Sequence, residues 1–274
     1  KPKEVIVVSV KNITEKMLKS LENILGCDIP LIFIYSDSNN AHIDKKIGCE
    51  KASGDIVCFL DDDVILYENF IKEILKGFRK NKVDAIQPLI KSPMTDSGLR
   101  YVIKKITLLN IDKGKGRIMK SGYPSMPFGS KREEKMEILM GASCFKRTIF
   151  ENKDYFEPEV AVTVHWADIF FSRNISLDGY EFLYYPEAKM IHFHEPGGRR
   201  ALNSYVAGHI FNHWLLWYRY IDKNFISFFS YYWSSMWGYI LFLFLAIKNG
   251  SFKKTLLGLK QGKIWIKRYK KSKV

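Results

Sequence analysis

Short apolar runs alternate with amphipathic segments over the first sixty residues. Val5–Val10, Leu31–Tyr35 and Ile56–Leu60 are rich in β-branched residues and have the length of buried strands. Helices are expected from Asn12 to about Leu25 and from about Ala41 to Ala52. A strand-helix-strand-helix-strand order implies right-handed crossovers and a parallel sheet, which binds ligands at the carboxyl ends of its strands.

The pattern continues with a helix over Tyr67–Arg79 and a fourth strand over Ala85–Ile90. Residues 91–135 have little periodicity and many Lys, Gly, Ser and Pro residues, so they predict a loop-rich excursion. Regular structure is expected again from Met140 onward.

Three carboxylates, Asp61, Asp62 and Asp63, follow the third predicted strand directly. Adjacent like charges are unfavourable unless a cation binds among them. Asp61 and Asp63 are one residue apart, so an extended loop brings two oxygen ligands toward one hard divalent cation. The alternative is a solvated acidic turn that caps the next helix, but the apolar strand leading into it favours the metal site.

The net charge of +14 is unevenly distributed. Lys248–Lys273 holds ten basic residues and no acidic one, which favours a polyanionic partner. Its lysines alternate with apolar residues, so an amphipathic helix on anionic lipid is expected rather than nucleic-acid binding. The four cysteines show no metal-ligand spacing and predict reduced, buried thiols of a cytosolic chain.

A change of composition near residue 204 predicts two regions, 1–203 and a helical appendage over 204–274. Phe225–Ile247 carries no charge and, as a helix, would extend about 35 Å, enough to cross a bilayer. A single crossing would place the basic tail outside, against the positive-inside tendency. We therefore expect peripheral or monotopic helices on the cytoplasmic membrane face, with a buried helical subdomain or an oligomer interface as the alternative.

The segment Ser53–Val64 resembles the acidic motif of family 2 inverting glycosyltransferases with a GT-A fold. The resemblance implies an α/β fold with a Rossmann-like, mostly parallel central sheet flanked by helices. It also implies transfer of a sugar from a UDP- or GDP-sugar, here to a lipid-linked or cell-envelope glycan acceptor. The loop after Val5–Val10 lacks the family's proline and tyrosine.

The resemblance also suggests donor-binding residues. Asp37 takes the position that contacts the nucleotide base, although a helix cap is an alternative. Lys45 stands where the family has an arginine, and Asp61 and Asp62 face the donor. Gly141, in a segment similar to the family's small-residue turn before a helix, would let the backbone approach the transferred sugar.

Aligned back from Gly179-Tyr180, the catalytic base of the family falls on Asp168, and Trp166 is expected at the acceptor. Ala167 and Phe170 stand where relatives carry further carboxylates. Because of these departures, an alternative is that the protein is a catalytically silent family member that binds sugar nucleotide at a membrane. Asp168 capping its own helix is a second alternative.

His192 matches the histidine that completes the metal site in several relatives, with His194 as the other candidate two residues on. An imidazole beside two carboxylates is a reasonable ligand set for Mn²⁺ or Mg²⁺. Arg199 and Arg200 follow two glycines. Their guanidinium groups are expected to bind the donor diphosphate from a loop.

Overall fold

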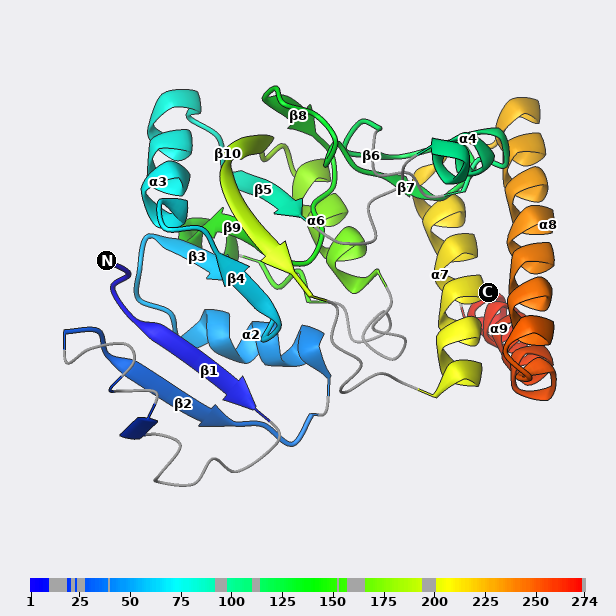
Figure 1. The fold of residues 1–274 in the computed structure, drawn as a ribbon, viewed down its shortest axis with the longest axis horizontal. Coiled ribbons are helices and arrows are strands. Elements are labelled where there is room, and N and C mark those ends of the chain that lie inside the picture. Colours follow the sequence, from blue (N-terminus) through cyan, green and yellow to red (C-terminus); the bar gives the residue numbers. More distant parts are fainter. Residues whose placement is uncertain are drawn as a thin grey trace.

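The structure, a computed structural model, describes residues 1–9, 19–20, 23, 28–38, 40–91, 98–109, 114–151, 153–156, 166–193 and 201–272. An α/β body carries the strands, and three long helices gather at one side of it (Figure 1). The predicted helix over 12–25 lies largely outside the described residues. The strands are β1 (Val5–Ser9), β2 (Leu31–Tyr35), β3 (Ile56–Phe59), β4 (Val64–Leu66), β5 (Ala85–Lys91), β6 (Arg117–Ile118), β7 (Pro124–Ser125), β8 (Glu134–Met136), β9 (Ser143–Lys146) and β10 (Phe182–His192). The helices are α2 (Ala41–Lys51), α3 (Phe70–Asn81), α4 (Gly98–Ile106), the 3₁₀ helix η1 (Arg147–Phe150), α6 (Ala167–Leu177), α7 (Leu202–Tyr220), α8 (Phe225–Lys248) and α9 (Phe252–Ser272).

The central sheet has the order β3-β9-β5-β10-β4, with β8 also paired to β10. β10 is parallel to β5, whereas the β3–β9, β5–β9, β4–β10 and β8–β10 ladders are antiparallel. β1 and β2 form a separate parallel ladder. The α/β class is therefore confirmed, but the described sheet is mixed rather than mostly parallel, because β9 inserts between β3 and β5 from later in the chain.

Alternate residues of the central strands belong to two cores, one on each face of the sheet. Ala85, Phe145 and Tyr184 contribute to the core that contains α6, and their neighbours Ile86 and Cys144 to the core under α3. This is the two-residue period of a strand buried on both faces. Because helices pack on both faces of the sheet, the strand ends that carry the acidic residues are held in place.

Helix α7 belongs to the larger of these cores. Phe211, Trp214, Leu215 and Leu216 join the cluster that contains the α6 residue Phe170. The predicted boundary at residue 203 therefore falls beside a shared core.

Helix α9 lies closely against α7. A Cβ atom at Gly258 would lie 2.6 Å from the Asn203 carbonyl, and one at Gly262 would lie 2.9 Å from the Ala207 carbonyl. Only glycine permits this approach of the two backbones.

Helix α8 buries small residues and exposes large apolar ones, which is the reverse of an ordinary surface helix. Its buried residues are all small: Ser227, Ser230, Ser234, Gly238 and Ala246. Its exposed residues include a stripe of large apolar side chains at spacings of three or four: Phe225, Phe229, Tyr232, Met236, Ile240, Phe244 and Ile247. Among the described helices, none is long and apolar enough to span a bilayer.

Other predictions from the sequence have clear outcomes. α3 begins three residues after the predicted start, and the excursion over 91–135 holds α4, β6, β7 and β8 in its described parts. Cys49 and Cys144 are buried as expected, but Cys58 is exposed, because β3 is an edge strand. Its sulfur faces that of Cys144 across the β3–β9 ladder at 2.6 Å.

Candidate active site

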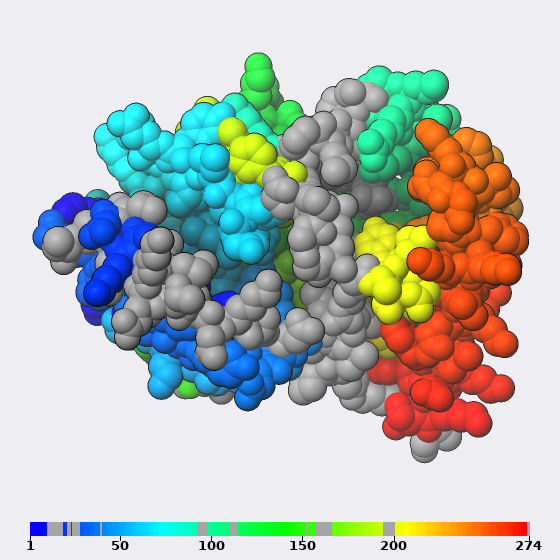
Figure 2. Space-filling view, turned by 60° about the horizontal axis from the view of Figure 1, so that its bottom comes forward, coloured from blue at the N-terminus to red at the C-terminus, as the bar shows by residue number. Residues whose placement is uncertain are grey.

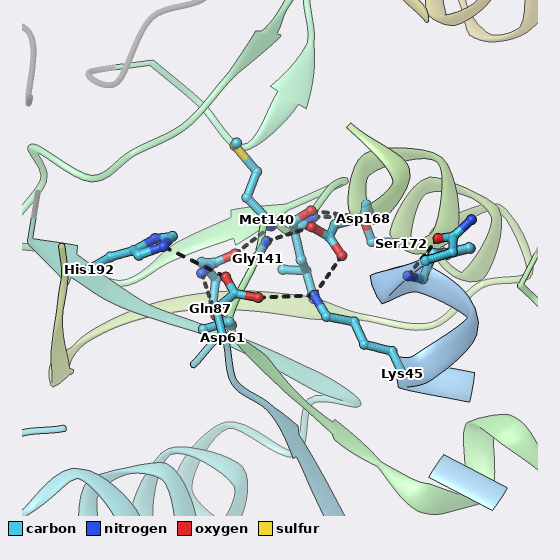
Figure 3. Close-up of polar contacts among 12 residues, drawn as sticks. Lys45, Asp61, Gln87, Met140, Gly141, Asp168, Ser172 and His192 are labelled. Atoms are coloured by element: carbon cyan, nitrogen blue, oxygen red, sulfur yellow. Dashed lines mark hydrogen bonds and ion pairs between the residues drawn. The ribbon is translucent and has the colours of Figure 1, made fainter. Parts of the chain in front are cut away.

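The β4–β10 ladder brings the acidic triplet to a histidine from the far end of the chain. His192 is paired with Val64, the residue that follows Asp63. The His192 Nε2 atom lies 2.8 Å from Asp63 Oδ1 and 4.0 Å from Asp61 Oδ2. The three side chains predicted for a metal site therefore lie at one strand end, with His192 pointing toward the acidic loop (Figure 3).

The donor types of this cluster suit a divalent cation. Two carboxylates and an imidazole are a reasonable ligand set for manganese or magnesium. In the structure only His192 and Asp63 are at hydrogen-bond distance, and no group of three His, Cys, Asp or Glu residues in the described part of the chain is arranged to hold a metal ion. Asp61, Asp63 and His192 are the residues that would bind one.

Asp168 stands in the first turn of α6, and its carboxylate points out of the helix toward two partners. Oδ2 accepts the Gly141 backbone N–H at 3.2 Å, and Oδ1 lies 3.0 Å from Lys45 Nζ. The N-cap residue of the helix is Trp166, whose side chain makes no capping hydrogen bond. The Asp168 carboxylate therefore bonds to the loop that holds Gly141 and to Lys45 of α2, and it does not cap its own helix.

Lys45 joins the two halves of the site. From α2 its ammonium group lies 3.0 Å from Asp168 Oδ1 and 3.6 Å from Asp61 Oδ1, and the side chain is 16% exposed. Burial acts to lower the pKa of Lys45, but the two carboxylates outweigh it and raise that pKa above the ordinary value. The lysine is charged at neutral pH and offsets the charge of both acids.

Gly141 sits between the two carboxylates. Its φ of +50° is a left-handed conformation that favours glycine, and a Cβ atom would lie 3.5 Å from Asp61 Oδ2. The Gly141 N–H donates to Asp168, and the lack of a side chain at Gly141 leaves room for the Asp61 carboxylate.

Two positioning side chains were not predicted from the sequence. Gln87, fully buried in β5, accepts the Met140 N–H at 2.7 Å and donates to the Ala142 carbonyl at 3.0 Å, which fixes both sides of Gly141. Ser172 accepts the Leu139 N–H at 2.8 Å from α6. A glutamine within the apolar run Ala85–Ile90 was the signal for the first, because a buried amide needs partners.

The remaining predicted residues are placed as follows. Asp37 is exposed and interacts with Tyr35, whose pKa is raised by the hydrogen bond and charge of that carboxylate. Asp62 is exposed beside its two neighbours, and Trp166 packs against Tyr123 and His209. His194, Arg199 and Arg200 lie outside the described residues.

Two family positions that lack carboxylates have a packing explanation. Ala167 and Phe170 are buried in the core beneath α6, and the Phe170 ring lies 6.0 Å from that of Tyr220 on α7. A carboxylate at Phe170 would be buried in an apolar environment.

A pocket of about 430 Å³ opens on the outer side of α2. Its charged side chains have partners: Lys46 pairs with Asp154, Arg147 with Glu151, and Lys153 with Asp178 outside the pocket. Among the described residues the pocket therefore offers no unpaired charge to a ligand, and it is separate from the site around Asp168.

A sequence model of the family described as glycosyl transferase family 2 matches residues 1–149, more than half of the chain. The chain belongs to glycosyl transferase family 2. The membership of family 2 and the GT-A fold expected from the resemblance are thereby confirmed. A comparison with curated protein sequences gives no match.

Solved structures similar to this family 2 chain are GT-A glycosyltransferases. S. aureus TarS 1-349 matches with a TM-score of 0.52 at 12% identity, over 85% of this chain and 62% of that one. The same protein in complex with UDP-GlcNAc gives 0.50 at 13%, over 81% and 60%. GalNAc-T7 with UDP, GalNAc and Mn²⁺ gives 0.50 at 15%, over 75% and 41%. The chain thus spans about two fifths to three fifths of these neighbours.

Proposed function

We propose that the protein is a metal-dependent, inverting glycosyltransferase that moves a sugar from a UDP- or GDP-sugar to a lipid-linked or cell-envelope glycan acceptor at the cytoplasmic membrane face. The observation that carries the proposal is the convergence of Asp168, Gly141, Lys45 and Asp61 at the strand ends of a family 2 fold. The GT-A neighbours were solved with UDP-GlcNAc and with UDP, GalNAc and Mn²⁺, which supports a nucleotide-sugar donor.

Asp168 suits the role of the base. In an inverting transfer the acceptor oxygen attacks the anomeric carbon, the bond to the diphosphate oxygen breaks, and the acceptor proton must go to a base on the opposite face. The Asp168 side chain is 34% exposed, and each of its oxygens contacts one partner, so lone pairs remain for a hydroxyl proton. Gly141 and Lys45 hold the carboxylate in place for this proton.

Asp61, Asp63 and His192 suit the donor side. A divalent cation bound there would neutralise charge on the diphosphate leaving group. Lys45, held between Asp61 and Asp168, adds a positive charge near the same place. Arg199 and Arg200 are proposed to bind the diphosphate, and Asp37 and Asp62 the nucleoside and sugar.

The membrane assignment rests on α8. Large apolar side chains face outward along its length, 84% exposed at Phe225 and 70% at Ile247, while serines and glycine face the protein. A continuous row of exposed large apolar side chains is typical of an interaction site. α4, α8 and the basic α9 occupy one side of the molecule, away from β1 and β2 (Figures 1 and 2), so an anionic bilayer would meet apolar and cationic groups together.

The test is donor turnover with and without metal. Purified protein is assayed for hydrolysis and transfer with UDP- and GDP-sugars, in Mn²⁺, Mg²⁺ or chelator. Asp63→Ala should abolish metal-dependent nucleotide binding in calorimetry, because it removes the carboxylate bonded to His192. Asp55→Ala, at the opposite end of β3, is the matched control. Unchanged nucleotide affinity in Asp63→Ala with metal present would refute the metal site.

A catalytically silent member is the second candidate, because Ala167 and Phe170 replace family carboxylates. Such a protein would bind nucleotide sugar at the membrane without turnover. Binding in calorimetry combined with no hydrolysis or transfer from any donor would favour it.

A further inference from the structure

Three rings from three separate elements are in mutual contact immediately before the helix that carries Asp168. Trp166 precedes α6, Tyr123 lies between β6 and β7, and His209 belongs to α7. The ring centroids are 5.6 Å apart for Tyr123 and Trp166, 4.8 Å for Trp166 and His209, and 5.6 Å for Tyr123 and His209. The Tyr123 hydroxyl lies 3.0 Å from His209 Nε2. We call these three residues the ring triangle.

Trp166 has an unusual backbone. Its φ of 60° and ψ of 21° are left-handed, a conformation that is unfavourable for a bulky side chain unless the surroundings impose it. Its carbonyl accepts the N–H groups of Ile169 at 3.0 Å and Phe170 at 3.3 Å. The first turn of α6 therefore starts from a residue whose conformation must be held from outside.

We propose that Tyr123 and His209 are positioning residues for Asp168. They hold the Trp166 ring, and with it the left-handed turn, so that α6 directs Asp168 toward Gly141 and Lys45. The inference rests on the proposed function in so far as Asp168 is the base. Neither residue is placed at the reacting atoms.

Burial fixes the protonation of Tyr123 and of the neighbouring His213. Tyr123 is 2% exposed, and burial raises the pKa of its hydroxyl well above the ordinary value, so the hydroxyl keeps its proton. The His213 ring lies 4.0 Å from that of Tyr123, and its Nε2 is 2.7 Å from the Ser121 carbonyl. Since a carbonyl only accepts, His213 Nε2 carries the hydrogen, and burial lowers the pKa of His213 to about 4. Tyr123 is thus packed against a neutral imidazole.

The ring triangle connects the base to the apolar helix α8. A Cβ atom at Gly238 would lie 3.0 Å from the Tyr123 hydroxyl oxygen, and the His209 ring is 5.1 Å from that of Phe242. Helices that the sequence suggested as a membrane appendage therefore support the start of the catalytic helix.

The experiment removes one hydroxyl and keeps the ring. Tyr123→Phe should lower kcat about tenfold with the donor KM and nucleotide Kd unchanged, because the lost hydrogen bond loosens the base and not the donor site. Tyr184→Phe is the matched control, since it removes another buried tyrosine hydroxyl, which lies 3.2 Å from the Ser130 carbonyl and not at a residue of the ring triangle. His209→Phe, which keeps a ring against Trp166, should retain more activity than His209→Ala.

Hydrogen exchange provides a readout that does not depend on turnover. In Tyr123→Phe the peptide over 167–173 should exchange faster than in wild type, because the Ile169 and Phe170 amides bond to Trp166. Tyr184→Phe should leave that peptide unchanged. Equal exchange of this peptide in the two variants overturns the positioning role. If the peptide exchanges faster in Tyr123→Phe but the wild-type protein transfers no sugar, the positioning role is supported and only the proposed function is refuted.

Discussion

At the residue scale, the site is an arrangement of opposite charges around one glycine. Lys45 neutralises two carboxylates that would otherwise repel each other across Gly141, and it does so from a helix that precedes both in the chain. Removing any one of the three charges should change the behaviour of the other two, so variants at these positions are not expected to be additive.

Asp168→Asn keeps the shape of the side chain and removes its ability to take a proton. Transfer should fall by about 10²–10⁴, the usual contribution of a positioned base, while nucleotide binding persists. Single-turnover rates and calorimetry measure the two quantities. Asp178→Asn, at the other end of α6, is the control for loss of a carboxylate; equal turnover of Asp168→Asn and wild type would place the base elsewhere.

Lys45→Met should destabilise the protein in a way that depends on pH. Because the folded state raises the pKa of Lys45, the stabilisation is fully present below the ordinary lysine value near 10.5 and is lost as the pH rises through the higher folded value. The difference in unfolding free energy between wild type and variant should be constant from pH 7 to 9 and shrink above about 10.5. Urea titrations along this series test the sign, and a difference that grows toward high pH would contradict it.

At the element scale, the sequence best predicted the strands and helices that are determined by their own local pattern of apolar and polar residues. β2 was predicted with its observed bounds, and β1, β3, β5 and α2 to within a residue, because each is a continuous apolar or amphipathic run. The antiparallel insertion of β9 was missed, because strand pairing depends on contacts between residues about ninety positions apart, such as Cys58 with Cys144. Gln87 was missed for the same reason, since its partners belong to another segment.

The helix α8 makes the clearest prediction at this scale. Full-length protein should float with anionic liposomes, with one part of the binding lost at high salt and another retained. Attraction of each lysine near the surface is worth about 1 kcal/mol and is screened by salt, whereas burial of apolar side chains is not. Phe229→Ser with Phe244→Ser should reduce the salt-resistant part.

Charge variants on α9 separate the two contributions. Lys263→Gln with Lys267→Gln should reduce only the salt-sensitive part. Protein that stays at the bottom of the gradient at low salt would mean that the α8 face contacts another protein or a second copy of the chain.

At the scale of the whole molecule, α7 determines whether the catalytic region is independent. Leu216→Ala should destabilise the protein by about 2–5 kcal/mol, because Leu216 is fully buried in the core shared with α6. Thermal unfolding should show one transition, with nucleotide binding lost in it. Leu257→Ala, on the exposed face of α9, should change stability by less than about 0.5 kcal/mol; a loss of less than about 0.5 kcal/mol in Leu216→Ala as well would mean that α7 is not part of the core.

The shared core also has a consequence for how the chain is made. A ribosome releases the strands and α6 before it has synthesised Phe211–Trp217, the side chains that close the larger core. Phe171 of α6 already packs against Phe145 and Phe150, but until then the side of α6 around Phe170, which packs on Tyr220 of α7, is uncovered. The nascent protein therefore passes through a stage in which part of the apolar surface of α6 is exposed to aggregation. Co-translational chaperones, or early contact of the emerging α8 with a bilayer, would shorten that stage.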